Sequence, residues 1–333
     1  MALAAPTARA EDYFLTIGGG YSPSGNQVSL EKNILYFTSL LDENKLSNRP
    51  HHIIFADGPK PGRTVQFTDP SDPVPPINKL LGMLVGSTKG LDHRYRKHRI
   101  PDVKGPSSVQ SIDRWFETTG SKLQSGDRLV IYFTGHGGKA SNKKSQDTKI
   151  YLWNRKSMPM TDFVKRLDKL DPSVQVVAVM VQCYSGGFAN LIFKEGDPKK
   201  GMAAHNRVGF YATVHDRVAA GCTPDINEAN YQEYSTHFWA GLFGKTRLGQ
   251  VVRDSDYNQD GRVGYNEAHA YALIHSDTID ISIKTSGAFL RRYASTKKDS
   301  KHPDRLSSES DYTTLLAKAT PAERTTLEAL SKQ

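Results

Sequence analysis

The stretch from Val174 to Phe188, VQVVAVMVQCYSGGF, decides the fold expected of this chain. It begins as an almost continuous apolar run rich in β-branched residues, the pattern of a strand buried on both faces of a parallel sheet. The run ends at Gln182, Cys183 and Tyr184, and a Ser-Gly-Gly turn follows. The sequence therefore predicts a buried strand that delivers the Cys183 thiol to one edge of a sheet.

A second stretch, Asp127 to Gly138, has the same design. It reads DRLVIYFTGHGG and places His136 directly after its apolar run. Because the carboxyl ends of parallel strands meet at one edge of a sheet, we expect the thiol and the imidazole to lie close together. The two stretches therefore predict a Cys/His pair in which the imidazole activates the thiol as a nucleophile.

Strands and helices alternate along the rest of the chain. Apolar runs between turn residues predict strands, and apolar residues spaced by three and four predict helices, the first of them capped by Ser29. This alternation predicts an α/β fold with a mainly parallel central sheet and helices on both faces. The expected strands are 13–17, 52–56, 129–134, 150–153, 174–181 and 208–214, and the expected helices are 29–41, 107–118, 160–170, 236–243 and 266–275.

Two segments are interpreted as irregular surface structure. Residues 57–78 are rich in Pro and Gly, which predicts a long excursion rather than a regular element. The cluster from Arg94 to Arg99 interleaves an aromatic residue with cations and is interpreted as a solvated loop.

Charge and hydropathy argue against nucleic-acid binding and against a membrane-spanning helix. The net charge is +9, but the Lys and Arg residues are spread along the chain rather than packed into a recognition helix, so nucleic-acid binding is not expected. No run approaches the roughly 20 apolar residues that a membrane-spanning helix needs, so no membrane span is expected.

The chain has only two cysteines, Cys183 and Cys222, so no disulfide framework is expected to hold the fold. Cys222 is expected to be a buried thiol. A regulatory disulfide between the two cysteines in an oxidising compartment is the alternative.

The N-terminus carries a possible address signal. Residues 1–10 end in Ala8-Arg9-Ala10, a pattern similar to the cleavage site of a secretory signal peptide. This pattern favours export to the periplasm or the outside of the cell. A disordered terminus on a cytoplasmic protein is the alternative.

The residues around His136 supply a further requirement of acyl chemistry. An oxyanion that forms on an attacked carbonyl needs two hydrogen-bond donors. Gly137 and Gly138 leave the backbone amides after the histidine sterically bare. The amides of Gly137 and Cys183 are therefore the expected donor pair.

These motifs resemble those of a known group of enzymes. TGHGG after one hydrophobic strand and QCYSGGF after a later one, with the histidine first, resemble the caspase, metacaspase and legumain superfamily of cysteine peptidases over residues 13–242. The resemblance implies a caspase-like fold and a cysteine endopeptidase acting on protein or peptide substrates. It implies Cys183 as nucleophile, His136 as general acid and base, and Gly137 with Cys183 as oxyanion donors, with no obligatory Asp partner.

The sequence departs from these relatives around the cysteine. Metacaspases and legumains typically place an acidic residue two positions before it, where this chain has Val181, and legumains place another directly after it, where this chain has Tyr184. The residue preferred before the cleaved bond therefore stays open. Acidic residues after the 208–214 strand are interpreted either as a pocket for Arg or Lys or as ordinary surface carboxylates: Asp216, Asp225, Glu228 and Glu233.

Two other functions are compatible with the same motifs. One is a non-catalytic, calcium-binding relative that keeps the fold, and the other is a Cys/His amidase or acyl transferase. The expected organisation is a leader at 1–10, a peptidase domain at 11–293 and a polar tail with a short helix at 294–333. The sequence leaves the oligomeric state open.

A separate motif, DYNQDGRVGYNE from Asp256 to Glu267, matches the EF-hand calcium loop. It places Gly at the sharp turn of loop position 6 and an apolar residue at position 8. The motif predicts a Ca²⁺ site that either staples the fold or orders residues 231–244 beside the thiol. The expected ligands are Asp256, Asn258, Asp260, the carbonyl of Arg262, and bidentate Glu267.

Overall fold

The computed structural model describes residues 10–88, 90–141, 146–293 and 310–332. The expected leader, apart from its last residue, and residues 294–309 of the expected tail lie outside the described residues. Among the described residues, no helix combines the length and the apolar character needed to cross a membrane.

The centre of the molecule is a seven-stranded sheet with the order β12-β11-β10-β6-β1-β2-β5. Neighbouring strands are parallel except for the antiparallel pair of β11 and β12. The prediction of an α/β fold with a mainly parallel sheet is therefore confirmed. The strands are β1 (Asp12–Gly19), β2 (His51–Phe55), β5 (Val103–Gly105), β6 (Arg128–Gly135), β10 (Gln175–Met180), β11 (Arg207–Tyr211) and β12 (Ile283–Lys284).

One face of the sheet packs against α3 (Val109–Thr118), α4 (Met160–Leu167) and the 3₁₀ segment η3 (Ser185–Ile192). The helices present apolar residues at helical spacing, and alternate residues of the strands meet them in one cluster. Trp115 and Phe163 are among its fully buried side chains.

The other face packs against α1 (Val28–Glu43), α5 (Tyr234–Phe243) and α6 (Tyr265–His275). Its centre is aromatic: the Trp239 ring lies 4.4 Å from that of Phe37 and 5.2 Å from that of Tyr132, centroid to centroid. Because both faces are covered, the strands of the sheet are buried on both sides, which explains their continuous apolar sequences.

The predicted N-cap of the first helix is wrong by two residues. Gln27 is the residue before α1, and Ser29 lies inside the helix, where its buried hydroxyl has no hydrogen-bond partner. The helix begins at Val28 because Val28 is itself fully buried in the core beside β2.

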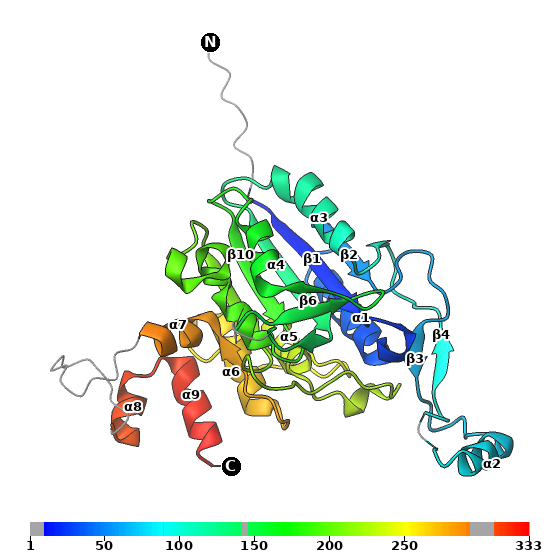
Figure 1. Ribbon diagram of the computed structural model, residues 1–333. Helices are drawn as coiled ribbons and strands as arrows, with labels where there is room; N and C mark the ends of the chain where they lie inside the picture. The colour runs from blue at the N-terminus through cyan, green and yellow to red at the C-terminus, as the bar shows by residue number, and fades with distance from the viewer. Residues whose placement is uncertain (1–9, 89, 142–145, 294–309, 333) are drawn as a thin grey trace.

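Residues 57–78 are more regular than predicted, because they contain the strand β3 (Val65–Phe67) and the start of the helix α2 (Pro76–Leu84). β3 pairs in antiparallel fashion with β4 (Arg94–Arg96), which lies in the second segment predicted to be a loop. Figure 1 shows α2 projecting from the rest of the molecule beyond this pair. The expectation of an irregular excursion is therefore wrong for these parts, because strand pairing satisfies backbone groups that local sequence does not reveal.

The basic cluster at residues 94–99 is also not a solvated loop. The Arg96 guanidinium forms two hydrogen bonds with the carboxylate of Glu31, a fully buried residue on α1. The amide of Arg99 donates to the same carboxylate. A buried carboxylate requires such partners, so the cluster closes over α1.

A small sheet lies beside the end of β6. It consists of β7 (Gly137–Gly138), β8 (Lys149–Leu152) and β9 (Lys156–Pro159), all antiparallel. The predicted edge strand at 150–153 is thus a strand of this second sheet rather than of the central one. Residues 142–145 of the polar connection fall outside the described residues.

The C-terminal part consists of α7 (Thr285–Tyr293), α8 (Tyr312–Lys318) and α9 (Pro321–Leu330). Figure 1 shows α9 next to α6, and the two helices are in contact. The helix expected near the end of the chain is therefore present. It covers α6 and not the strand end that carries Cys183.

Candidate functional site

Cys183 and His136 follow neighbouring strands. β6 and β10 pair in parallel, with Phe133 opposite Met180, so both chains leave the sheet at the same edge. His136 comes directly after β6, and Cys183 lies three residues after β10. The predicted placement of both residues after neighbouring parallel strands is therefore found, and the pairing of the thiol with the imidazole stays a prediction.

The backbone turns sharply directly after the thiol. Tyr184 has a φ of 61°, a left-handed conformation that is uncommon for a residue with a side chain. Its amide donates to the carbonyl of Arg217 at 2.8 Å, which holds the turn in place. Gly186 then passes so close to Val214 that a Cβ would lie 2.8 Å from the Val214 carbonyl carbon. The Ser-Gly-Gly sequence is therefore needed for the close approach of two backbones.

The Cys183 thiol is half-buried and interacts with the backbone of residue 219. The Ala219 amide donates to Sγ at 3.3 Å, and Sγ lies 3.8 Å from the Ala219 carbonyl oxygen. Burial raises the pKa of Cys183, and the Ala219 amide opposes that rise. The resting group is therefore a neutral thiol with one donor already directed at its sulfur.

The His136 imidazole is fixed through one nitrogen. Its Nε2 lies 2.8 Å from the carbonyl oxygen of Gly25 and 2.9 Å from Oε1 of Gln27. A carbonyl oxygen only accepts, so Nε2 carries the proton, and in the neutral ring Nδ1 keeps a free lone pair. Burial lowers the pKa of His136, which favours this neutral form.

No hydrogen bond joins the thiol of Cys183 to the imidazole of His136, both of which belong to the described part of the chain. The link between the two segments is a backbone contact. A Cβ on Gly137 would lie only 2.2 Å from the carbonyl oxygen of Cys183 and 2.5 Å from Cγ of Gln182. Gly137 and Cys183 are therefore packed main chain against main chain, and the expected role of their amides as oxyanion donors stays a prediction.

An open cleft of about 690 Å³ lies in front of these residues. Its walls include Gly137 and Cys183, the rings of Tyr151 and Tyr184, and the exposed side chain of Lys139. The Lys139 ammonium lies 5.8 Å from the centroid of the Tyr184 ring. A larger cavity, of about 960 Å³, lies beside the EF-hand-like loop, but the thiol does not line it.

Residues 218–226 form a wall beside the thiol, and we call this segment the thiol wall. Ala219 provides the contact with Cys183, and the Cys222 thiol lies 3.9 Å from the carbonyl oxygen of Gly135, the residue before His136. Both cysteines are free, and burial raises the pKa of Cys222. Cys222 as a residue is half-buried, like Cys183, so the expectation of a buried thiol holds for the surroundings of its sulfur and not for the whole residue.

The four acidic residues considered as a specificity pocket do not gather at the cleft. Asp216 is exposed, and Asp225 accepts hydrogen bonds from Asn227 and Asn230. Glu228 and Glu233 are both paired with Arg247, so neither is an ordinary surface carboxylate. The described residues that line the cleft include none of the four.

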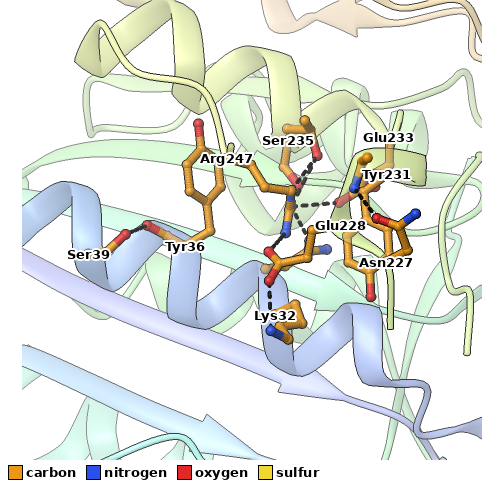
Figure 2. A network of polar contacts seen from close by, with 12 residues as sticks. Lys32, Tyr36, Ser39, Asn227, Glu228, Tyr231, Glu233, Ser235 and Arg247 are labelled. Carbon is orange, nitrogen blue, oxygen red and sulfur yellow. Dashed lines mark hydrogen bonds and ion pairs between the residues drawn. The ribbon is translucent and has the colours of Figure 1, made fainter. Parts of the chain in front are cut away.

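Two residues that contact or support the thiol wall were not predicted from the sequence. Asp280 accepts the amide of Ala220 at 2.7 Å, and burial raises the pKa of its carboxyl to about 6. Arg247 lies at the centre of a polar network with Glu228 and Glu233, shown in Figure 2. Neither residue belongs to a local motif, so the sequence offers no signal for its role.

The EF-hand-like loop has the internal bonding of its motif. Gly261 has a φ of 83°, and its amide donates to Asp256 Oδ2 at 2.9 Å. The Asn258 and Asp260 side chains accept the amides of residues 260 and 262, and Glu267 accepts the amides of residues 258 and 264. The four side chains expected to bind Ca²⁺ therefore all accept hydrogen bonds from backbone amides of this loop.

Glu267 also serves as the capping residue of α6, which begins after Gly264. Across the described chain, no group of three or more His, Cys, Asp and Glu side chains is arranged to hold a metal ion. The donor chemistry of the loop suits Ca²⁺, since it consists of carboxylate, amide and carbonyl oxygens. The loop lines the larger cavity together with Asp12 and Arg128, which lie at the amino ends of β1 and β6. It is thus at the opposite edge of the sheet from Cys183.

Comparison with known proteins adds no argument about function. No protein-family model matches the sequence, and no curated protein matches it. A similar solved structure is the crystal structure of protein GSU0716 from Geobacter sulfurreducens, with 12% identity over 64% of this chain and 77% of that chain and a TM-score of 0.36. A likeness this weak carries no functional argument, and the α/β class follows from the strand order described above.

Proposed function

We propose that this protein is a cysteine endopeptidase that uses Cys183 and His136. The observation that carries the proposal is that the paired strands β6 and β10 end at one edge of the sheet, where Cys183 lines an open cleft and His136 directly follows the neighbouring strand. Ligands of open α/β sheets bind at the carboxyl ends of the strands, which is where both groups lie. The resemblance of the two motifs to those of caspases, metacaspases and legumains supports the same reaction.

The resting pair is neutral, and this assigns the direction of proton transfer. As the sulfur of Cys183 bonds to the carbonyl carbon of the substrate, the thiol proton moves to Nδ1 of His136, since Nε2 is engaged by Gly25. The imidazolium then gives this proton to the leaving amine as the C–N bond breaks. Water, activated by the same imidazole, hydrolyses the thioester and regenerates the thiol.

The developing oxyanion requires two donors. The amides of Gly137 and Cys183 are the proposed pair, because the two residues already lie against one another at the cleft. Backbone donors of this kind are preorganised and need no reorientation during the reaction. Glycine is the only residue type that permits this contact at position 137, since any Cβ there would collide with the Cys183 carbonyl.

The same machinery would serve an amidase or an acyl transferase. An endopeptidase is favoured because the cleft is open enough for an extended chain to pass, with the Tyr151 and Tyr184 rings along it. The non-catalytic alternative is less consistent with a thiol that is only half-buried and that lines a cleft.

We also propose that the 256–267 loop binds Ca²⁺ through Asp256, Asn258, Asp260, the Arg262 carbonyl and Glu267. The position of the loop at the amino edge of the sheet favours a stapling role over a direct effect on the thiol. Ca²⁺ would supply positive charge to a cluster of acidic side chains between α5 and α6, and so would stabilise the packing of these two helices.

A labelling experiment tests the proposed nucleophile without knowledge of the substrate. The native protein is treated with iodoacetamide at sub-stoichiometric concentration, and the modified cysteine is identified by mass spectrometry. We expect modification at Cys183 in preference to Cys222, and slower modification in His136→Ala, which lacks the proton acceptor. Equal labelling of both cysteines, or a rate unaffected by His136→Ala, would refute the dyad.

A further inference from the structure

Arg247 is the most completely engaged cation in the described structure. Its side chain is 2% exposed and lies between two aromatic rings, 4.9 Å from the centroid of Tyr36 and 4.8 Å from that of Tyr231. Figure 2 shows the guanidinium between α1 and the chain segment that carries Glu228 and Tyr231. Contacts of this type with both faces of a buried guanidinium fix its plane.

The edge of the guanidinium is bonded in that plane. Nη2 donates to Asn33 Oδ1 at 2.6 Å, to Glu233 Oε1 at 3.1 Å and to Thr236 Oγ1 at 3.0 Å. Nη1 donates to Glu228 Oε2 at 3.2 Å. These partners belong to α1, to α5 and to the connection before α5, so one side chain joins three parts of the chain.

Two of its partners support the thiol wall, residues 218–226. Gly221 lies directly on Glu233, because a Cβ on Gly221 would be 3.2 Å from the Cβ of Glu233. The Tyr231 hydroxyl donates to the carbonyl of Asp225 at 2.5 Å. The wall is thus held at its middle and at its end by residues that Arg247 itself fixes.

A third partner leads to the histidine. Asn33 accepts from Arg247 and donates to Thr134 Oγ1 at 3.0 Å, and Thr134 lies on β6 two residues before His136. Arg247 therefore connects the strand that carries the imidazole with the segment that contacts the thiol. The residues that link Arg247 to the two sides are all buried: Asn33, Thr134, Tyr231 and Glu233.

The thiol wall needs such support because its own backbone is strained. Gly221 has a φ of 111° and Cys222 a φ of 56°, the second being a left-handed conformation at a residue with a side chain. Such conformations persist only where surrounding contacts hold them. The wall meets the thiol at Ala219, whose amide and carbonyl oxygen lie 3.3 and 3.8 Å from Sγ, so a small movement of the wall would break this contact.

We infer that Arg247 is a positioning residue that holds the thiol wall against Cys183 and in register with the His136 strand. The inference rests on the proposed function in one respect, that the wall acts on the catalytic thiol. It assigns no contact between Arg247 and substrate, since the residue is buried and does not line the cleft among the described residues.

Arg247→Met tests this role through Cys222, a residue of the wall whose thiol lies against the Gly135 carbonyl. In Arg247→Met we expect native-state alkylation of Cys222 to rise at least tenfold. We expect kcat for a peptide substrate to fall by about tenfold, a partial loss compared with the roughly 10²-fold cost of a full 1 Å displacement. Arg247→Lys keeps the charge without the planar fork and should restore part of both.

Arg207→Met is the matched control. Arg207 is also a buried, ion-paired arginine, bonded to Asp168 at 2.7 Å and to the Leu191 carbonyl at 3.0 Å, but it lies at the amino end of β11, away from the wall. We expect its loss to lower the melting temperature without exposing Cys222. Both variants are labelled at the same number of degrees below their own melting temperatures. An equal rate of Cys222 alkylation in the two would overturn the positioning role.

Tyr231→Phe provides a second variant if Arg247→Met fails to fold. It keeps the ring against Arg247 and removes only the bond to the Asp225 carbonyl, so Cys222 should label faster than in wild type. Unchanged labelling of Cys222 in Arg247→Lys and Tyr231→Phe would also overturn the inference. The labelling rates of Cys222 do not depend on peptidase activity. Full turnover in Cys183→Ala would contradict the proposed function and is therefore a separate outcome.

Discussion

Gly137→Ala gives the sharpest structural test of the proposed oxyanion hole. The new Cβ would lie 2.2 Å from the Cys183 carbonyl oxygen and 2.5 Å from Cγ of Gln182. Carbon and oxygen atoms that are not bonded stay more than about 3 Å apart, so the two backbones must separate by roughly 1 Å. The first obstacle is a backbone oxygen, which cannot move without moving Cys183 itself.

This separation acts directly on the reacting geometry. A misplacement of about 1 Å between reacting groups costs about 10²-fold in rate. Loss of one oxyanion donor costs about 10²- to 10³-fold in kcat. We therefore expect Gly137→Ala to lower kcat by at least about 10²-fold, with a smaller change in KM, because the donor acts in the transition state.

Gly138→Ala is the matched control for this variant. Its new Cβ would lie 2.5 Å from the Tyr151 hydroxyl and 3.0 Å from Cε of Lys149, both of them ends of side chains that can rotate away. We expect a much smaller loss of kcat than in Gly137→Ala. The assay is steady-state cleavage of a fluorogenic peptide, with circular dichroism to confirm that both variants are folded. A folded Gly137→Ala with kcat close to wild type would refute the proposed donor pair.

Three further predictions follow from other contacts. In Gly20→Ala the new Cβ would lie 1.9 Å from the carbonyl oxygen of Gly25, the oxygen that accepts from His136. The imidazole would be displaced, so kcat/KM for a peptide should fall by about 10²-fold. Unchanged turnover would contradict the role of this carbonyl. The pKa of Asp280 is about 6 in the folded protein and 3.8 ordinarily, so the folded state binds the proton more tightly than the unfolded state. The free energy of unfolding therefore falls as the pH rises from 4 to 6. The fall is about 3 kcal/mol at 1.36 kcal/mol per pKa unit. Asp280→Asn should therefore be more stable than wild type in denaturant melts at pH 8 but not at pH 4, and a gain at both would show that the charge is not the cause. Chelation of Ca²⁺ should lower the melting temperature of wild type but not of Glu267→Gln, with kcat/KM unchanged at 25 °C; a loss of activity without a loss of stability would indicate regulation instead of a staple.

The sheet and the strand ends could be predicted from the sequence because their signals are local. The apolar runs before His136 and Cys183 each fix a buried strand, and alternation with helices fixes a parallel arrangement. The glycine after each functional residue marks a close backbone approach. From these signals the common edge of β6 and β10 follows without further information.

The surroundings of the thiol could not be predicted in this way. Arg247 meets Asn33, which is more than 200 positions away in the sequence, and the Gly25 carbonyl that fixes His136 is separated from it by 111 positions. These contacts depend on how α1 and α5 pack on the sheet, and no local pattern encodes them. The pair of β3 and β4 was missed for the same reason, since each strand is only three residues long and β4 carries two arginines.

The acidic residues after β11 show the limit of composition as a guide to specificity. Their number suggested a pocket for a basic side chain, yet Glu228 and Glu233 bind Arg247 and stabilise the thiol wall. A carboxylate with an internal cation is not free to recognise a substrate cation. Residue preference before the cleaved bond therefore has to be measured rather than inferred from these residues.

The most direct test of the central claim is turnover of a random peptide library by wild type, Cys183→Ala and Cys222→Ala, followed by mass spectrometry of the products. We predict cleavage of internal peptide bonds by wild type and by Cys222→Ala, and none above background by Cys183→Ala, with all three proteins folded. Cleavage by Cys183→Ala at the wild-type rate would contradict the account.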